Sequence, residues 1–176
     1  LDCACGEHSR LFTSVLAPYR YRFPMNSLVQ EFKYRQRFYL GRVLGQLLAS
    51  AAIEQSVPRP EVLLPVPMPE DRFKDRGFNS AQIIADVVAR ELALPIESHW
   101  ATRLENTVAL AGMSRERRQM SIRGAFGVSD RVYGRHVGIV DDVLTTGATS
   151  SELARECFDT GARAVSVWVV ARTASN

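Results

Sequence analysis

The feature that most restricts how this chain can fold is a strand–turn–helix pattern in its second half. The apolar run Val137-Gly-Ile-Val leads directly into Asp141 and Asp142, and a turn rich in threonine and glycine follows. A helix is expected after the turn, with Thr149 and Glu152 spaced as a capping box. A buried strand that enters a helix in this way is typical of an α/β fold, in which ligands bind at the carboxyl ends of the strands.

The turn itself has the chemistry of an anion-binding site. Successive backbone amides that lead into a helix attract phosphate, and Gly147 allows the backbone to approach it closely. Carboxylates are poor phosphate ligands, so Asp141 and Asp142 are expected to accept hydrogen bonds from sugar hydroxyls or to reach Mg²⁺ through water. The alternative, a structural corner with two solvated aspartates, fits less well because adjacent acids repel and no lysine lies near them in the sequence. The pattern therefore predicts a ribose 5-phosphate site formed by Asp141, Asp142, Val143, Leu144, Thr145, Thr146, Gly147, Ala148 and Thr149.

Hydrophobic periodicity predicts the remaining elements of an α/β chain. Helices are expected from Pro24 to Phe32 and over 40–52, 80–92 and 149–160, and strands over 62–64, 96–102, 137–140 and 164–170. Residues 1–20 are expected to be irregular and residues 69–77 turn-like, and no repeat is present. The alternation of strands and helices predicts a central, mainly parallel sheet flanked by helices. The composition, with 46% hydrophobic and 23% charged residues, excludes a disordered chain. No uninterrupted apolar run is long enough to span a membrane, and the length of 176 residues indicates one domain.

The basic residues are almost all arginines, which bind phosphate in a bidentate manner better than lysine does. Of 22 basic residues only Lys33 and Lys74 are lysines, and the net charge of +3 is too small to indicate nucleic-acid binding by itself. Arginines are also frequent in residues 103–125, which are expected to form a long functional loop with a polar helix.

The cysteines point to a reducing compartment. There are three of them, and no signal peptide is recognisable, so a cytoplasmic location is expected. Cys157 lies on the apolar face of an expected helix and is interpreted as a core residue. Cys3 and Cys5, with His8, are interpreted as a fragment of a metal site; structural zinc needs four ligands, so a complete site within this chain is not expected. The chain begins with Leu1 rather than Met, so the missing ligands could precede it.

The strand–turn–helix segment closely resembles the phosphoribosyl pyrophosphate signature of type I phosphoribosyltransferases. The rest of the chain is more specifically similar to the ComF family of competence proteins. The resemblance covers about residues 21–173 and rests on Tyr21 to Tyr34 with Phe32-Lys33-Tyr34, on Leu64-Pro65-Val66-Pro67, Arg72 and Arg76-Gly77-Phe78-Asn79, on Thr107, Ser114, Arg118 and Ala125-Phe126, and on Ala171-Arg172-Thr173. The chain departs from the family pattern at Ser80, Leu110 and Ser121, which leaves substrate contacts of the loop and hood open.

The resemblance implies a fold, a ligand and a cofactor. The fold is that of type I phosphoribosyltransferases, with a small hood over the sheet. The acid pair binds ribose hydroxyls, the Thr-Gly turn binds the 5-phosphate, and Val66-Pro67 faces the pyrophosphate and its Mg²⁺. The segment 103–123 matches a mobile loop that closes over the site. Residues 1–20 match the remnant of an N-terminal zinc ribbon with Cys3 and Cys5, so Zn²⁺ is expected only with further ligands, and 21–176 match the phosphoribosyltransferase-like domain.

Two functions remain open from the sequence. The first is a phosphoribosyl (glycosyl) transferase linked to competence, with Arg76, Asp141 and Asp142 as candidate catalytic residues and an unknown acceptor. Arg72, Lys74 and Arg76 form either a pyrophosphate clamp or a solvated turn. The second is a non-catalytic adaptor for single-stranded DNA in natural transformation. Residues 20–42 contain six basic residues and one acidic residue, a charge excess suited to contacts with the phosphates of a DNA strand. The sequence shows no evident aromatic platform on which bases could stack.

Overall fold

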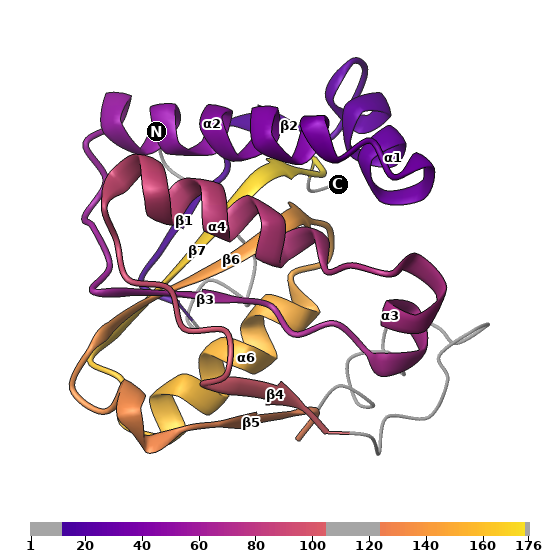
Figure 1. The fold of residues 1–176 in the computed structure, drawn as a ribbon. Helices are drawn as coiled ribbons and strands as arrows, with labels where there is room; N and C mark the ends of the chain where they lie inside the picture. The colour runs from indigo at the N-terminus through magenta and orange to yellow at the C-terminus, as the bar shows by residue number, and fades with distance from the viewer. Residues whose placement is uncertain (1–11, 105–123, 175–176) are drawn as a thin grey trace.

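A parallel sheet forms the centre of the computed structural model, which describes residues 12–104 and 124–174 (Figure 1). Its five strands are β1 (Ser14–Leu16), β2 (Tyr19–Arg20), β3 (Val62–Pro65), β6 (His136–Leu144) and β7 (Ala164–Arg172). The strand order is β1-β7-β6-β3. The strand β2 pairs with the end of β7, after the residues of β7 that pair with β1, and all these pairs are parallel. A separate antiparallel pair consists of β4 (Ala101–Arg103) and β5 (Phe126–Val128).

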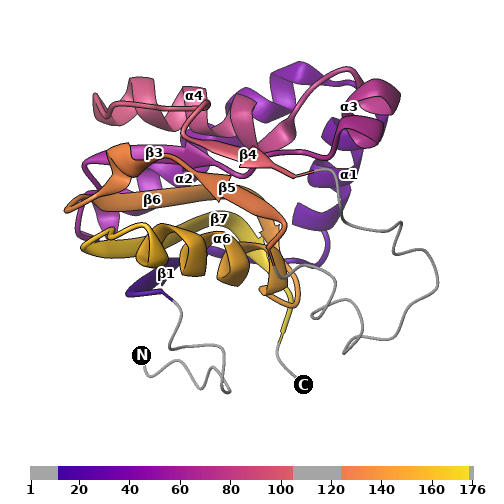
Figure 2. The same ribbon diagram turned by 90° about the horizontal axis from the view of Figure 1, so that it is seen from below.

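Helices cover both faces of the sheet. Figure 1 shows α1 (Met25–Arg35), α2 (Phe38–Glu54) and α4 (Ser80–Leu92) on one face, and α6 (Ala148–Asp159) with β4 and β5 on the other. The short helix α3 (Glu70–Arg76) follows β3, and a 3₁₀ turn spans Asp130–Val132. Figure 2, seen from below, shows α6 in front of β7 and running in the direction of the strands. Within the described part of the chain, no helix combines the length and the apolar character of a membrane span.

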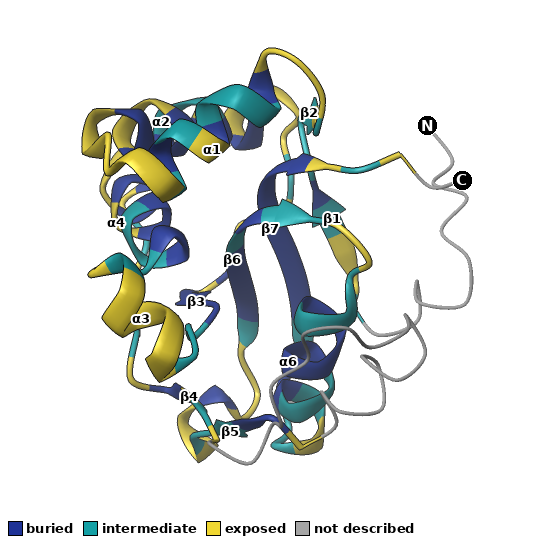
Figure 3. Ribbon diagram, turned by 90° about the vertical axis from the view of Figure 1, so that its right-hand side faces the viewer, coloured by how far each residue is buried: buried dark blue, intermediate teal, exposed yellow. Residues whose placement is uncertain are grey.

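Two apolar clusters hold these layers together, one on each face of the sheet. The cluster under α1, α2 and α4 includes Phe32, Leu44, Ile84 and Trp168, all almost fully buried. The other cluster packs Leu153 of α6 against the opposite face of the strands. Figure 3 shows that β6 and β7 are buried along most of their length. This double coverage explains why these strands are continuous apolar runs in the sequence.

The expected fold class is confirmed: the central sheet is parallel and is flanked by helices. The four expected helices and the strands at 62–64, 137–140 and 164–170 are also confirmed, and β6 continues through the acid pair to Leu144. Of the strand expected over 96–102, the structure forms β4 at its end and an isolated bridge between Leu63 and Ile96.

Two expectations about irregular segments are wrong. Within residues 1–20, Ser14–Leu16 form β1 and Tyr19–Arg20 form β2, and both strands pair with β7 as part of the main sheet. Residues 70–76 form α3, which has acidic residues in its first turn, basic residues in its last turn and Gly77 at its end with a φ of 80°. These charges complement the helix dipole. Because α3 buries none of its residues, it has no apolar periodicity that the sequence could reveal.

The close packing of α2 on α4 depends on a glycine, and this contact gives a stability prediction. A Cβ at Gly45 would lie 2.6 Å from Cβ of Val87 and 3.1 Å from the carbonyl oxygen of Ile84. Gly45→Val is therefore expected to lower the free energy of unfolding by about 2 kcal/mol or more through overpacking. Urea denaturation measures this change, with Ser50→Val on the exposed face of the same helix as the control. Equal midpoints for the two variants would contradict the packing argument.

Candidate functional site

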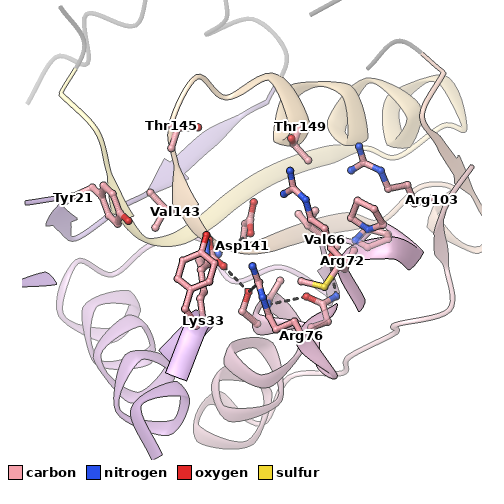
Figure 4. A pocket seen from close by; sticks show the side chains of 18 residues that line it. Tyr21, Lys33, Val66, Arg72, Arg76, Arg103, Asp141, Val143, Thr145 and Thr149 are labelled. Carbon is pink, nitrogen blue, oxygen red and sulfur yellow. Dashed lines mark hydrogen bonds and ion pairs between the residues drawn. The ribbon is translucent and has the colours of Figure 1, made fainter. Parts of the chain in front are cut away.

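A cleft of about 280 Å³ opens at the carboxyl ends of β3 and β6 (Figure 4). Its walls come from the end of α1, the loop after β3 with α3, the start of α4, β4 and the β6–α6 turn. This is the edge at which ligands bind in open α/β sheets. The lining residues are Tyr21, Lys33, Tyr34, Val66, Pro67, Met68, Pro69, Arg72, Arg76, Asn79, Ser80, Ala81, Arg103, Asp141, Asp142, Val143, Thr145 and Thr149.

Asp142 lies in the wall of this cleft and is already bound by the protein on both carboxylate oxygens. Lys33 of α1 donates from Nζ to Oδ1 at 2.6 Å, and Ser80 of α4 donates from Oγ to Oδ2 at 2.6 Å. The residue is only 5% exposed. The interpretation that no lysine offsets the acid pair is therefore wrong, because Lys33 lies 109 residues away in the sequence and reaches the pair through the fold.

Asp141 is the more accessible member of the pair. It is half-buried and lines the cleft, and its Oδ1 accepts a hydrogen bond from the backbone amide of Asp142 at 2.8 Å. Burial and then the neighbouring charge of Asp142 raise the pKa of Asp141 to about 7, while Lys33 opposes the rise. The expected contact of Asp141 with ribose hydroxyls stays a prediction, but its position leaves the carboxylate facing the cleft (Figure 4).

The raised pKa of Asp141 gives a prediction for the unliganded protein. Between pH 4 and 7 the folded state holds a proton that the unfolded state has released, because the folded pKa is about 7 and the ordinary value is 3.8. The stabilisation from this proton is present at low pH and is lost as the pH rises through 7. Asp141→Asn is therefore expected to gain stability relative to the natural chain as the pH rises from 4 to 8. Urea denaturation of both proteins across that range measures the difference, and a constant difference would contradict the raised pKa.

The Thr-Gly turn connects β6 to α6 in the expected place, but its details differ from the expectation. Gly147 occupies the N-cap position with a φ of 76°, which favours glycine. The predicted capping box is wrong, because α6 begins at Ala148 and Thr149 already lies in its first turn. The carboxylate of Glu152 accepts instead from the backbone amide of Gly124 at 2.6 Å and from Arg155.

The turn is only partly free for a ligand. The backbone amide of Ala148 donates to Oγ1 of Thr146 at 3.3 Å, and Thr173 donates to the carbonyl oxygen of Thr145 at 3.0 Å. Thr145, Thr149 and Val143 line the cleft. The four other residues of the predicted phosphate site, Leu144, Thr146, Gly147 and Ala148, are not part of the lining.

Two further arginines of the cleft are Arg72 of α3 and Arg103 of β4. Burial, together with the positive charge of Arg72, lowers the pKa of Arg103, and Asp71 opposes this effect. Nε of Arg103 is buried and has no hydrogen-bond partner among the described residues. A partly buried guanidinium that feels a second positive charge and has an unused donor is an environment that an anion would stabilise. Figure 4 shows the side chains of Arg72 and Arg103 reaching toward the cleft from the same side.

The loop after β3 completes the cleft. Val66 and Pro67 line it as predicted, and Asn79 donates from Nδ2 to the carbonyl oxygen of Val66 at 3.0 Å. Arg76 also lines it, lies over the ring of Tyr34 at 5.5 Å and donates to Oγ of Ser80 at 3.4 Å. Arg76 is thus next to the Lys33–Asp142–Ser80 contacts.

Several cleft residues were not predicted from the sequence. From the neighbouring sequence, Lys33 is a cation that suits the end of a helix. Ser80 is expected at the start of a helix, and Arg103 is expected in a loop. The signal that could have drawn attention to Lys33 is its rarity, because it is one of two lysines. Cys3, Cys5 and most of the segment 103–123 lie outside the described residues. Within the described residues, no three His, Cys, Asp or Glu side chains are grouped as a metal site.

The chain is similar to curated competence and DNA-utilization proteins. It is 30% identical over 156 residues to Competence protein F of Haemophilus influenzae, covering 85% of this chain and 68% of that protein. It is 31% identical over 157 residues to DNA utilization protein YhgH of Escherichia coli, covering 87% of this chain and 69% of that protein. Competence protein ComFC of Bacillus subtilis is 26% identical, with coverages of 88% and 62%. No protein-family model matches the chain.

A solved structure shares the fold. It is the glutamine phosphoribosylpyrophosphate amidotransferase of B. subtilis complexed with ADP and GMP, which is 22% identical with a TM-score of 0.50. The match covers 73% of this chain and 25% of that chain, so it concerns the fold alone. The parallel sheet and the match to this solved structure show a type I phosphoribosyltransferase fold, and the 30% sequence identity with Competence protein F shows that the chain belongs to the ComF family of competence proteins.

Proposed function

We propose that this protein binds phosphoribosyl pyrophosphate, or a related ribose 5-phosphate ligand, in the cleft at the carboxyl ends of β3 and β6. One observation carries the proposal: a single cleft is lined by Thr145 and Thr149 at the β6–α6 turn, by the half-buried Asp141 and by the two arginines Arg72 and Arg103. A ligand with a phosphate at one end, a diol in the middle and a pyrophosphate at the other end matches this sequence of groups.

Each group has a separate task in this proposal. The turn around Thr145 and Thr149 holds the 5-phosphate with hydroxyl and backbone donors. Asp141 accepts hydrogen bonds from the ribose hydroxyls, which an ionised carboxylate does well. Arg72 and Arg103 bind the pyrophosphate, where their positive charges balance an anion instead of repelling each other.

The cleft also fits a Mg²⁺ ion that arrives with the ligand. Mg²⁺ is usually held by one or two carboxylates together with substrate phosphates. Asp142 is engaged by Lys33 and Ser80, so Asp141 is the carboxylate of the cleft that remains available. When bound, the ion would neutralise charge on the pyrophosphate.

The proposed reaction is transfer of the phosphoribosyl group to an acceptor, which makes the protein a glycosyltransferase linked to competence. In such a transfer the bond between ribose C1 and pyrophosphate breaks as positive charge develops on the sugar. The chain contributes mainly by positioning the donor and by stabilising the departing pyrophosphate with Arg72, Arg103 and Arg76. The names of the relatives support the link to DNA uptake. The cytoplasm is the proposed compartment.

Isothermal titration calorimetry tests the proposal. The chain is titrated with phosphoribosyl pyrophosphate, ribose 5-phosphate and pyrophosphate, each with and without Mg²⁺. The proposal expects phosphoribosyl pyrophosphate to bind more tightly than either fragment, because it engages both sides of the cleft. If none of the three ligands binds, or if adenosine binds equally well, the proposal is wrong.

A second function, binding of single-stranded DNA, is favoured by an arrangement that the sequence did not reveal. Three aromatic side chains at the junction of α1 and α2 are exposed, Tyr34 by 73%, Phe38 by 51% and Tyr39 by 61%, although no aromatic platform was evident from the sequence. Arg35 and Arg37 lie between them. Exposed rings beside arginines can stack on bases and contact the backbone.

Fluorescence anisotropy with an oligothymidylate tests this second function. Binding at low salt, weakened steeply by added salt and reduced by Tyr34→Ala with Tyr39→Ala, is the expected result. An absence of binding at low salt would exclude the second function for this chain and leave the first unaffected.

A further inference from the structure

A second cavity, of about 390 Å³, lies between the end of α1 and helix α3 and adjoins the cleft described above. It is lined by Lys33, Tyr34, Gln36, Arg72, Asp75 and Arg76. Four of these six residues, Lys33, Tyr34, Arg72 and Arg76, also line the cleft. The two cavities therefore share a wall, and a ligand in either of them meets the same basic side chains.

The second cavity combines an exposed aromatic ring with two arginines. Tyr34 is largely exposed, and the guanidinium of Arg76 lies 5.5 Å from the centroid of its ring. Arg72 lines the same cavity from the preceding turn of α3. Aromatic rings beside arginines are the groups with which proteins hold single strands, because bases stack on the ring and the backbone phosphates contact the cations. The cavity therefore has the chemistry needed to hold one nucleotide of a strand.

Two polar residues distinguish the second cavity from the cleft. Gln36 and Asp75 line the second cavity and are not part of the lining of the cleft. Their side-chain oxygens can accept hydrogen bonds from the N–H groups at the edge of a base. The positive charge of Lys33 is already compensated by Asp142, to which its Nζ donates at 2.6 Å. Arg72 and Arg76 are therefore the cations that phosphate in the second cavity would use.

The same two arginines face the cleft. Nη1 of Arg76 donates to Oγ of Ser80 at 3.4 Å, and Ser80 donates to Asp142 in the wall of the cleft at 2.6 Å. The positive charge of Arg72 lowers the pKa of Arg103, which places Arg72 close to the proposed pyrophosphate position. Lys33, Arg72 and Arg76 are seen from the cleft in Figure 4. Both arginines thus stand on the boundary between the two cavities.

We propose that the second cavity binds one nucleotide of a single nucleic-acid strand, and that the strand and the phosphoribosyl ligand antagonise each other through Arg72 and Arg76. Two polyanions that lie against the same two cations repel each other, and each receives only part of the compensating charge. Each ligand therefore lowers the affinity for the other, by the same factor in both directions. The inference rests on both proposed functions and adds that the two ligands share part of their binding surface.

Fluorescence anisotropy of a labelled oligothymidylate, with pyrophosphate as the competitor, tests the antagonism. At constant ionic strength and constant Mg²⁺, saturating pyrophosphate is expected to raise the Kd of the strand by about tenfold or more. Ribose 5-phosphate, which in the proposed function lies at the turn and Asp141, should change this Kd by less than about threefold. Calorimetric titration of pyrophosphate into the complex with the strand should give the same factor as the anisotropy. A strand Kd that saturating pyrophosphate leaves unchanged would overturn the inference.

Matched glutamine variants separate a shared arginine from one that belongs to the cleft alone. Arg103 lines the cleft but not the second cavity. Arg103→Gln is therefore expected to weaken pyrophosphate binding by about tenfold and to leave strand binding within about threefold of the natural chain. Arg72→Gln should weaken both ligands by about tenfold, because it removes a shared contact. Arg90→Gln, on the exposed face of α4, is the control for loss of one positive charge.

The outcomes distinguish this inference from the proposed functions. If neither phosphoribosyl pyrophosphate nor pyrophosphate binds, the first function is wrong and the inference with it. If no strand binds at low salt, the second function and the inference are wrong, while the first function stands. If both ligands bind without weakening each other, or if Arg72→Gln weakens pyrophosphate alone, only the inference is overturned. Arg72 is exposed, so its variant is expected to fold, and melting temperatures of all variants check this.

Discussion

Replacing both Arg72 and Arg103 with glutamine is expected to lower the affinity for phosphoribosyl pyrophosphate by about 100- to 10,000-fold. Each arginine can make charge-assisted hydrogen bonds to pyrophosphate, and each such contact contributes about 1.5–3 kcal/mol. The unliganded protein should keep its melting temperature or gain slightly. The reason is that burial and the charge of Arg72 lower the pKa of Arg103, so the arginine pair is unfavourable without an anion.

Calorimetry and thermal unfolding together measure this result. Ribose 5-phosphate lacks the pyrophosphate group, so its affinity should change by less than about threefold in the double variant. Arg42→Gln with Arg90→Gln removes the same charge from exposed positions on α2 and α4 and serves as the matched control. An equal loss in that control would show that overall charge, rather than the arginine pair, governs binding.

Asp141→Asn is expected to have the second largest effect, a loss of about 10- to 100-fold in affinity for phosphoribosyl pyrophosphate. An ionised carboxylate accepts hydrogen bonds from a diol more strongly than an amide oxygen does, and the amide has one acceptor oxygen instead of two. Burial and the charge of Asp142 raise the pKa of Asp141, so the ionised side chain is unfavourable in the unliganded protein. The fold should therefore survive the substitution.

The control for Asp141→Asn is Asp86→Asn on the exposed face of α4. Binding of pyrophosphate alone should remain within about threefold of the natural chain, because that fragment does not reach the ribose position. A loss of pyrophosphate binding equal to the loss of phosphoribosyl pyrophosphate binding would contradict the assignment of Asp141 to the ribose.

Much of the fold could be predicted because its signals are local. Buried strands such as Val137 to Val140 are continuous apolar runs, and Gly147 marks the turn where a positive φ is needed. These features depend on residues within one element and its flanks. The strand–turn–helix corner could be assigned to a ligand site for this reason, whereas the expected place of Val66 and Pro67 at the same site came from the family resemblance.

The parts that could not be predicted depend on contacts between distant segments or on packing that leaves no pattern. Lys33 and Asp142 are 109 residues apart, so their ion pair follows from how α1 lies on the sheet. Arg103 becomes an anion-binding candidate only because α3 brings Arg72 near it. Strands as short as β1 and β2 owe their structure to the long neighbour β7 rather than to their own sequence.

A crystal structure with phosphoribosyl pyrophosphate and Mg²⁺ bound tests the central claim most directly. The proposal predicts the 5-phosphate at the turn of residues 145–149, the ribose hydroxyls on Asp141 and the pyrophosphate between Arg72 and Arg103, with the Lys33–Asp142 ion pair intact. A ligand in the reverse orientation, or bound outside this cleft, would contradict it.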